Sequence, residues 1–242
     1  MGFMKQESDG DMAAADASTR HAKVRVWDGP TRVTHWLIAL SFAFSWYSAE
    51  QHMMEWHYRS GMLMIGLVVF RGMWGIVGSS TARFGNFVRG PGRVWGYART
   101  VLTKEKSAHL GHNPLGGWSV VAMLALLATQ VGTGLFAVDV DGIESGPLSW
   151  LVSFEVGREL AAWHHTTFVI LQVLVVLHLS AIIFYLFFKR ENLVTPMISG
   201  LRHMSGNNAK SIAKAPIMAF LAALLVALGA VYVVSSGMPF LG

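Results

Sequence analysis

The stretch WHHTTFVILQVLVVLH, from Trp163 to His178, decides the fold of this chain. Apolar residues continue beyond it, so a helix over residues 162–188 exceeds the roughly 20 residues that a bilayer core of about 30 Å demands. Histidines within such a helix are costly in lipid and usually have a function. The stretch therefore predicts a membrane-spanning helix that places functional imidazoles inside a bilayer.

Composition places the rest of the chain in the same environment. Hydrophobic residues make up 53% of the 242 residues and charged residues only 14%, which excludes a soluble globular protein. The chain has no cysteine, so disulfides, thiolate-held iron–sulfur clusters and covalently attached c-type haem are excluded. Any haem bound here would therefore be held without a covalent bond to the protein.

Five apolar segments predict five spanning helices, over residues 31–49, 56–77, 116–137, 162–188 and 216–235. Asp28 is the expected N-cap of the first, with Pro30 in its first turn. We predict an all-α integral membrane helical bundle with a four-helix core over residues 23–203. Residues 1–22 predict a disordered cytoplasmic tail. Residues 204–242 predict a linker and a fifth transmembrane helix, whose small residues suit packing or homo-oligomer formation.

Lysine and arginine are distributed unequally among the predicted loops. The N-terminal tail carries five, the loop after the second helix six and the loop after the fourth helix five, whereas the opposite side carries two. The positive-inside rule then predicts a multi-pass membrane protein with a cytoplasmic N-terminus and a C-terminus on the outer side. The net charge of +5 is thus explained by contact with membrane lipid and topology, and indicates no nucleic-acid partner.

Four histidines fall at two depths of the predicted bundle. At about 100° and 1.5 Å per residue, His164 and His178 lie roughly 40° and about 21 Å apart on one helix. They share a face, whereas His165 points away from it. The directions of the helices pair His35 with His178 on the cytoplasmic side and His57 with His164 on the outer side. Two bis-histidine sites on facing helices suit two haem irons.

Three more residues are candidates for contact with such a cofactor. Gly61, one turn after His57, leaves room for a flat macrocycle. Arg71 and Arg32 lie near the cytoplasmic level and would each pair with a haem propionate, or instead extend to the inner headgroups. For His165 a supporting contact and a lipid-facing position both stay open. The other histidines are expected in loops or tails without a redox role: His21, His52, His109, His112 and His203.

Longer motifs carry a family resemblance: VWDGPTRVTHW from Val26, HYRSGMLMIGLVVFRGMWGIVGSSTARFGNFVRGP from His57, HNPLGG from His112 and KRENLVTPMISG from Lys189. With the opening stretch they resemble the bacterial di-haem cytochromes b, of the cytochrome b561 and nickel-iron hydrogenase b-type cytochrome subunit kind. The resemblance implies two haem b groups, with iron ligands at the four histidines that helix geometry selects. The chain departs from the family in its fifth helix and in His165, where many relatives have an acidic residue.

The resemblance implies a membrane cytochrome that transfers electrons between a periplasmic redox partner, such as a cytochrome c or a hydrogenase, and the quinone pool or another carrier. Bis-histidine iron has no open coordination position, which favours outer-sphere electron transfer. Two alternatives stay open: a self-standing quinol- or superoxide-linked oxidoreductase, and a haem-free membrane anchor or assembly subunit. We favour an electron-transfer subunit over a self-standing enzyme.

Two segments outside the predicted spans have distinctive composition. The outer loop over residues 138–161 is acidic and contains an apolar group, which would cover the outer haem or dock a basic partner. Residues 89–102 interleave arginine with aromatic and aliphatic residues, which predicts a short helix in the headgroup region. A quinone site is a candidate between that helix and the inner haem.

Overall fold

The computed structural model describes residues 21–103, 111–205 and 211–237. In chain order the elements are β1 (His21–Arg25), α2 (Gly29–Glu50), α3 (Met54–Val77), α4 (Phe84–Phe87), α5 (Pro91–Thr100), α6 (Pro114–Phe136), a short 3-10 turn η1 (Ser149–Leu151), α7 (Phe154–Phe187), α8 (Val194–Ser199), β2 (Leu201–Ser205) and α9 (Ile217–Ser236). Residues 1–20 of the predicted N-terminal tail lie outside the described residues.

All five predicted spans are helical in the structure. Within the described residues, α3, α6, α7 and α9 are long and apolar enough to cross a membrane. The first predicted span, α2, has 22 residues and the expected Asp28 N-cap, whose side chain accepts a hydrogen bond from the Thr31 amide at 2.6 Å. The residues that α2 buries are the polar Thr31, Thr34, Ser41 and Ser48. Its polar face therefore lies against the bundle, as a membrane environment favours.

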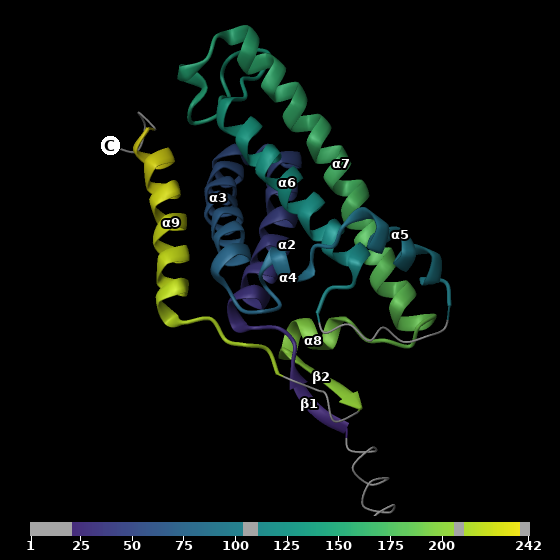
Figure 1. Cartoon of the computed structure of the whole chain (residues 1–242). Coiled ribbons are helices and arrows are strands. Elements are labelled where there is room, and N and C mark those ends of the chain that lie inside the picture. The colour runs from purple at the N-terminus through teal and green to yellow at the C-terminus, as the bar shows by residue number, and fades with distance from the viewer. Residues whose placement is uncertain (1–20, 104–110, 206–210, 238–242) are drawn as a thin grey trace, which may run out of the picture.

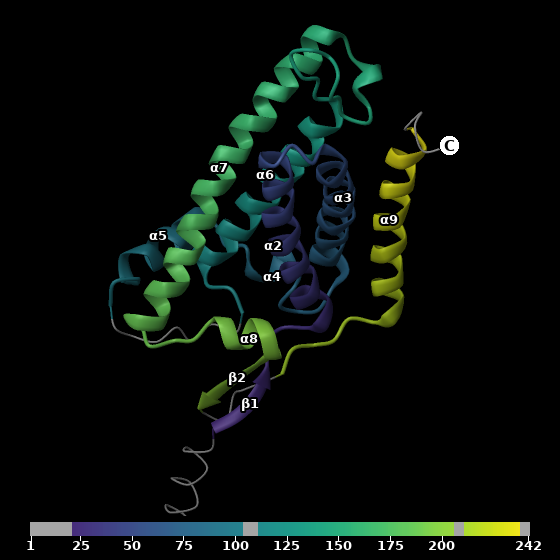
Figure 2. The ribbon, with the colours of Figure 1, turned by 180° about the vertical axis from the view of Figure 1, so that it is seen from behind.

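Helix α3 lies between two neighbours, with α2 on one side and α9 on the other, while α6 pairs with α7 (Figures 1 and 2). The contact between α3 and α9 contains Phe70 and Trp74 against Ala223 and Ala227. A second apolar cluster joins α3, α6 and α7 through Met64, Leu127 and Leu171. These two clusters hold the helices in one bundle.

A two-stranded antiparallel sheet accompanies the mostly helical fold, and the sequence analysis did not predict it. Strands β1 and β2 pair with Val24 opposite Arg202, at the end of the bundle that carries α8 (Figure 1). Residues 21 and 22, which the sequence analysis assigned to the disordered tail, belong to β1. Residues 204 and 205, which it assigned to the linker, belong to β2. The pairing joins segments about 180 residues apart in sequence, and no local pattern reveals such a contact.

Helix α7 also begins earlier than the sequence predicts. Its N-cap is Ser153, whose hydroxyl accepts a hydrogen bond from the Val156 amide, so the helix begins eight residues before the predicted start at residue 162. With 34 residues, α7 is about 50 Å long, well beyond a hydrocarbon core of about 30 Å. It runs obliquely across the bundle in both views (Figures 1 and 2). The short helix predicted within residues 89–102 is confirmed as α5.

Candidate functional site

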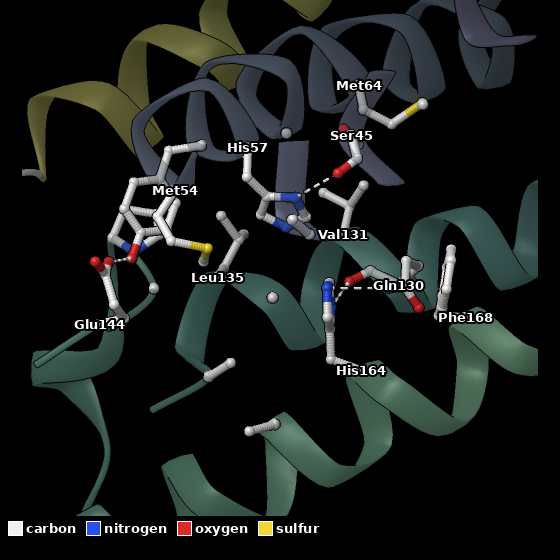
Figure 3. A pocket seen from close by; sticks show the side chains of 18 of the residues that line it. Ser45, Met54, His57, Met64, Gln130, Val131, Leu135, Glu144, His164 and Phe168 are labelled. Atoms are coloured by element: carbon white, nitrogen blue, oxygen red, sulfur yellow. Dashed lines mark hydrogen bonds between the residues drawn. The ribbon is translucent and has the colours of Figure 1, made fainter. Parts of the chain in front are cut away.

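The structure brings His57 of α3 and His164 of α7 face to face. Their ring centres are 6.1 Å apart and the ring planes are nearly perpendicular, at 83°. Both rings line a cavity of about 530 Å³ between α2, α3, α6 and α7, a volume within the roughly 300–1,000 Å³ typical of small-molecule and cofactor sites. Figure 3 shows the two side chains projecting toward each other across this cavity.

Backbone carbonyls fix the orientation of both rings. His57 Nδ1 lies 2.9 Å from the carbonyl oxygen of Ser45, and His164 Nδ1 lies 2.8 Å from that of Gln130. Because a carbonyl oxygen only accepts, each Nδ1 carries the hydrogen and each Nε2 keeps its lone pair. The Nε2 atom of each ring, which does not contact these carbonyls, is therefore the candidate metal ligand.

Gln130 is a site residue that the sequence interpretation missed. Its amide nitrogen lies 3.0 Å from His164 Nε2, while Thr167 donates a hydrogen bond to its side-chain oxygen. A lone amide within the apolar run of the third span was a usable signal, because polar side chains in lipid are rare and usually paired. Ser45 gave no such signal, since its backbone rather than its side chain holds His57.

Two glycines provide space around the outer pair. Gly61 lines the cavity, and a Cβ added there would meet nothing within 4 Å. A Cβ on Gly134 would lie 2.8 Å from His164 Cε1 and 3.0 Å from its Nδ1. The first glycine therefore borders open space, as predicted, whereas the second allows the His164 ring to lie against α6.

The second pair lies near the opposite end of α7. The ring centres of His35 and His178 are 6.4 Å apart, with the planes at 54°. The ring of Trp36 contacts His35 edge-on at 5.2 Å. His35 Nδ1 is buried without a hydrogen-bond partner among the described residues. The structure thus pairs the four histidines in the combination that helix direction predicts.

The two candidate arginines have different surroundings. Arg71 is buried, with only 6% of its surface exposed, so it does not extend to the headgroups. Its Nη1 lies 3.5 Å from the carbonyl oxygen of Ala82, and its guanidinium lies 5.1 Å from the Phe84 ring centre. Arg32 instead donates to the backbone carbonyls of Ile198 and Asp28. The bond to Ile198 links α2 to α8, and a propionate contact of Arg32 stays a prediction.

Two other histidines bear on the sites. His165 is exposed at the border of the outer cavity, so its side chain is turned away from the His57 pairing. His112 was assigned to a loop without a redox role, yet the structure encloses its ring between Trp27 and Phe87. Its position just before the α6 N-cap gave no periodic signal, because burial there depends on segments distant in sequence.

The outer loop contributes some side chains to the lining of the cavity and leaves others exposed on the surface. Glu144, Ser145 and Pro147 line the cavity, and Tyr58 donates a hydrogen bond of 2.8 Å to Glu144. Of the apolar residues predicted to form a group in this loop, Pro147 lines the cavity, whereas Trp150, Leu151 and Phe154 are 63%, 54% and 53% exposed, and Ile143 nearby is 81% exposed. Most of the apolar group therefore lies on the surface, where exposed apolar patches mark sites of protein contact.

Curated relatives extend over most of the chain. It is 25% identical over 226 residues to a probable Ni/Fe-hydrogenase B-type cytochrome subunit of Rhizobium leguminosarum bv. viciae, covering 78% of this chain and 94% of the relative. Proteins of the same description from Azotobacter chroococcum mcd 1 and Bradyrhizobium diazoefficiens are 23% and 24% identical, covering 76% and 78% of this chain and 90% and 91% of those relatives. No solved structure gives a significant match.

A family model covers the same region. The model described as prokaryotic cytochrome b561 matches residues 26–200, well over half of the chain and all four paired histidines. Membership implies a membrane protein that carries haem b and transfers electrons. The apolar helices and the paired imidazoles agree with that chemistry. The chain therefore belongs to the prokaryotic cytochrome b561 family.

Proposed function

We propose that this protein holds two haem b groups, one between His57 and His164 and one between His35 and His178, and passes electrons between them. The outer group would exchange electrons with a periplasmic redox protein. The inner group would exchange them with the quinone pool or another carrier. The bacterial inner membrane, with the N-terminus in the cytoplasm and the C-terminus in the periplasm, is the location that fits this proposal.

The distance between the two ring centres in each histidine pair is the main support for the proposal. An iron about 2 Å from one nitrogen of each ring, the usual length for imidazole on a first-row metal, would place two opposed ring centres about 6 Å apart. The observed separations are 6.1 Å and 6.4 Å. These helices could pack in many other registers. Two separate histidine pairs with this separation therefore favour a common cofactor-binding role over coincidence.

The donor set fits a haem better than a bare metal ion. No group of three or more histidine, cysteine, aspartate or glutamate side chains could hold a metal ion within the described residues. A haem needs only two protein ligands, because its macrocycle supplies the other four. The open space beside Gly61 and the cavity of about 530 Å³ at the outer pair also suit a flat macrocycle.

The residues around each pair would set the redox properties. A haem between two histidines supplies one-electron transfer and has no open position for oxygen. Hydrogen bonds from His57 and His164 to backbone carbonyls raise the basicity of the ligating nitrogens. At the inner pair, the buried charge of Arg71 suits a haem propionate, because buried charges in proteins are paired.

The outer surface is the candidate docking site for the redox partner. It combines exposed Ile143 and Trp150 with the acidic residues Asp139, Asp141 and Glu144. Such a surface suits a partner with basic residues around an apolar patch. The names of the relatives favour a hydrogenase as that partner, while a lysine-rich cytochrome c has the same complementary charge.

The haem content of the purified protein tests the proposal. We expect reduced b-type bands with two haems per chain, one haem in His164→Ala, one in His178→Ala and none in the double variant. His165→Ala, an exposed neighbour, is the matched control and should keep both. If the double variant retains its pigment, the ligand assignment is wrong.

Quinol oxidation separates the alternatives. We expect the periplasmic partner to reduce the haems of the isolated chain, and the isolated chain to sustain no steady oxidation of a quinol. Steady quinol turnover with an added acceptor would favour the self-standing oxidoreductase, and a wild-type chain without haem would favour the membrane anchor.

A further inference from the structure

The His112 ring is held in a fixed position at the cytoplasmic end of α6. Its centre lies 4.6 Å from the centre of the Trp27 ring and 4.5 Å from that of Phe87. Its Nδ1 is buried and has no hydrogen-bond partner in the described part of the chain. An unsatisfied buried polar atom costs about 1–3 kcal/mol, so a ring clamped in this way needs a partner that the described residues do not supply.

Three groups of the inner site act electrostatically on His112: Arg71, His35 and His178. Burial, together with the nearby Arg71, His35 and His178, lowers the pKa of His112 to about 3. The ring is therefore neutral at physiological pH, and a neutral imidazole still donates one hydrogen bond. His112 thus lies within electrostatic range of both inner histidines and of Arg71.

Arg71 is a buried cation that makes few hydrogen bonds among the described residues. Its guanidinium carries five N–H donors, yet the hydrogen bond found for it is the 3.5 Å contact with the Ala82 carbonyl. Asp28 is the acid whose charge acts on Arg71, but its carboxylate already accepts from Thr31, Trp74 and Ser79. Contacts through two aromatic rings connect Arg71 to His112: Arg71 lies over the Phe84 ring, Phe84 contacts Phe87, and Phe87 contacts His112. A buried cation with few hydrogen bonds among the described residues, beside a clamped imidazole donor, matches the needs of a carboxylate.

We propose that His112 and Arg71 bind one and the same carboxylate, a propionate of the inner haem, with His112 donating through Nδ1. This inference rests on the proposed function, because it assigns the group that the inner pair would hold. The Arg71 guanidinium would neutralise the charge of the carboxylate. The His112 ring, fixed between Trp27 and Phe87, would donate a hydrogen bond to it from a defined direction. His112 would then be a cofactor-binding residue of the inner site rather than a loop residue.

Replacing the His112 imidazole by a phenyl ring, which is also flat and aromatic but has no N–H, tests the hydrogen bond from His112. His112→Phe should keep both haems, because His35 and His178 remain, but should lower the reduction potential of the inner haem. The less neutralised carboxylate would favour ferric over ferrous iron. We expect about a tenfold change in the ratio of reduced to oxidised inner haem, which is 59 mV for a one-electron couple. Redox titration of the purified protein measures it.

Rescue by a donor separates hydrogen bonding from packing. His112→Gln retains an N–H and should restore most of the native potential, whereas an equal change in both variants would overturn the inference. An unchanged potential in His112→Phe would also overturn it. If the phenylalanine variant does not fold, His112→Leu against His112→Gln makes the same comparison.

The outer haem and a remote histidine provide controls. The outer haem potential should not change in any His112 variant, and the exposed His52 replaced by asparagine, which tolerates the left-handed backbone there (φ 54°), should leave the inner potential unchanged. Failure of the proposed function would look different, because the wild-type protein would then lack two haems.

Discussion

At the scale of single residues, the outer site depends on backbone groups as much as on side chains. His57 and His164 are oriented by carbonyls of Ser45 and Gln130, so their ring orientation follows from how α2 and α6 lie against them. The histidines themselves could be selected from spacing alone. Their hydrogen-bond acceptors could not, because any residue type supplies a carbonyl and only its position matters.

Gly134→Ala should weaken outer haem binding. The new methyl group would lie 2.8 Å from His164 Cε1, so the ring must move and its bond to the Gln130 carbonyl must lengthen. Changes to such supporting contacts typically reduce metal affinity about 10- to 100-fold. Haem content during dilution or competition with a haem-binding protein measures the loss.

Gly132→Ala is the matched control on the same helix. Nothing lies within 4 Å of its added Cβ, so this variant should bind both haems normally. Equal haem retention in the two alanine variants would show that the approach of α6 to His164 is not required.

At the scale of elements, α9 is an addition to the four-helix core. It contacts α3 through small residues: Ala223 is fully buried against the cluster of Phe70 and Trp74, and a Cβ on Gly66 would lie 3.2 Å from Val231. Small residues allow this close approach of helices in lipid. None of the residues of α9 lines the outer cavity, so its contribution is expected in stability rather than in cofactor binding.

Ala223→Leu should therefore destabilise the protein without changing its haem content. Overpacking of a filled contact typically costs about 1–3 kcal/mol, and the melting temperature in detergent should fall. Ala222→Leu, the same change at an exposed neighbour, should leave the melting temperature nearly unchanged. Loss of a haem from Ala223→Leu would instead place α9 among the elements that support the sites.

At the scale of the whole molecule, the two histidine pairs lie at different depths of one bundle, and the loops on its two sides differ in charge. The basic loops predict the cytoplasmic side and the acidic outer loop the periplasmic side. This orientation would place the His57 and His164 pair near the periplasm and the Arg71 level near the cytoplasm.

Single cysteines test this orientation, because the chain has no cysteine of its own. In intact spheroplasts, a membrane-impermeant maleimide should label Ile143→Cys in the outer loop but not Thr103→Cys after α5. After the membrane is permeabilised, both should be labelled. Labelling of only Thr103→Cys in intact spheroplasts would reverse the predicted topology.

The sequence alone determined the membrane environment, the five helices and the four paired histidines. Each of these follows from local composition or from the regular rise and rotation of a helix, which are properties of neighbouring residues. Only the tertiary structure decided the pairing of β1 with β2, the ring orientations set by Ser45 and Gln130, and the burial of His112 between Trp27 and Phe87. These features join segments that are distant along the chain, and the relative placement of packed helices is a property of the whole bundle.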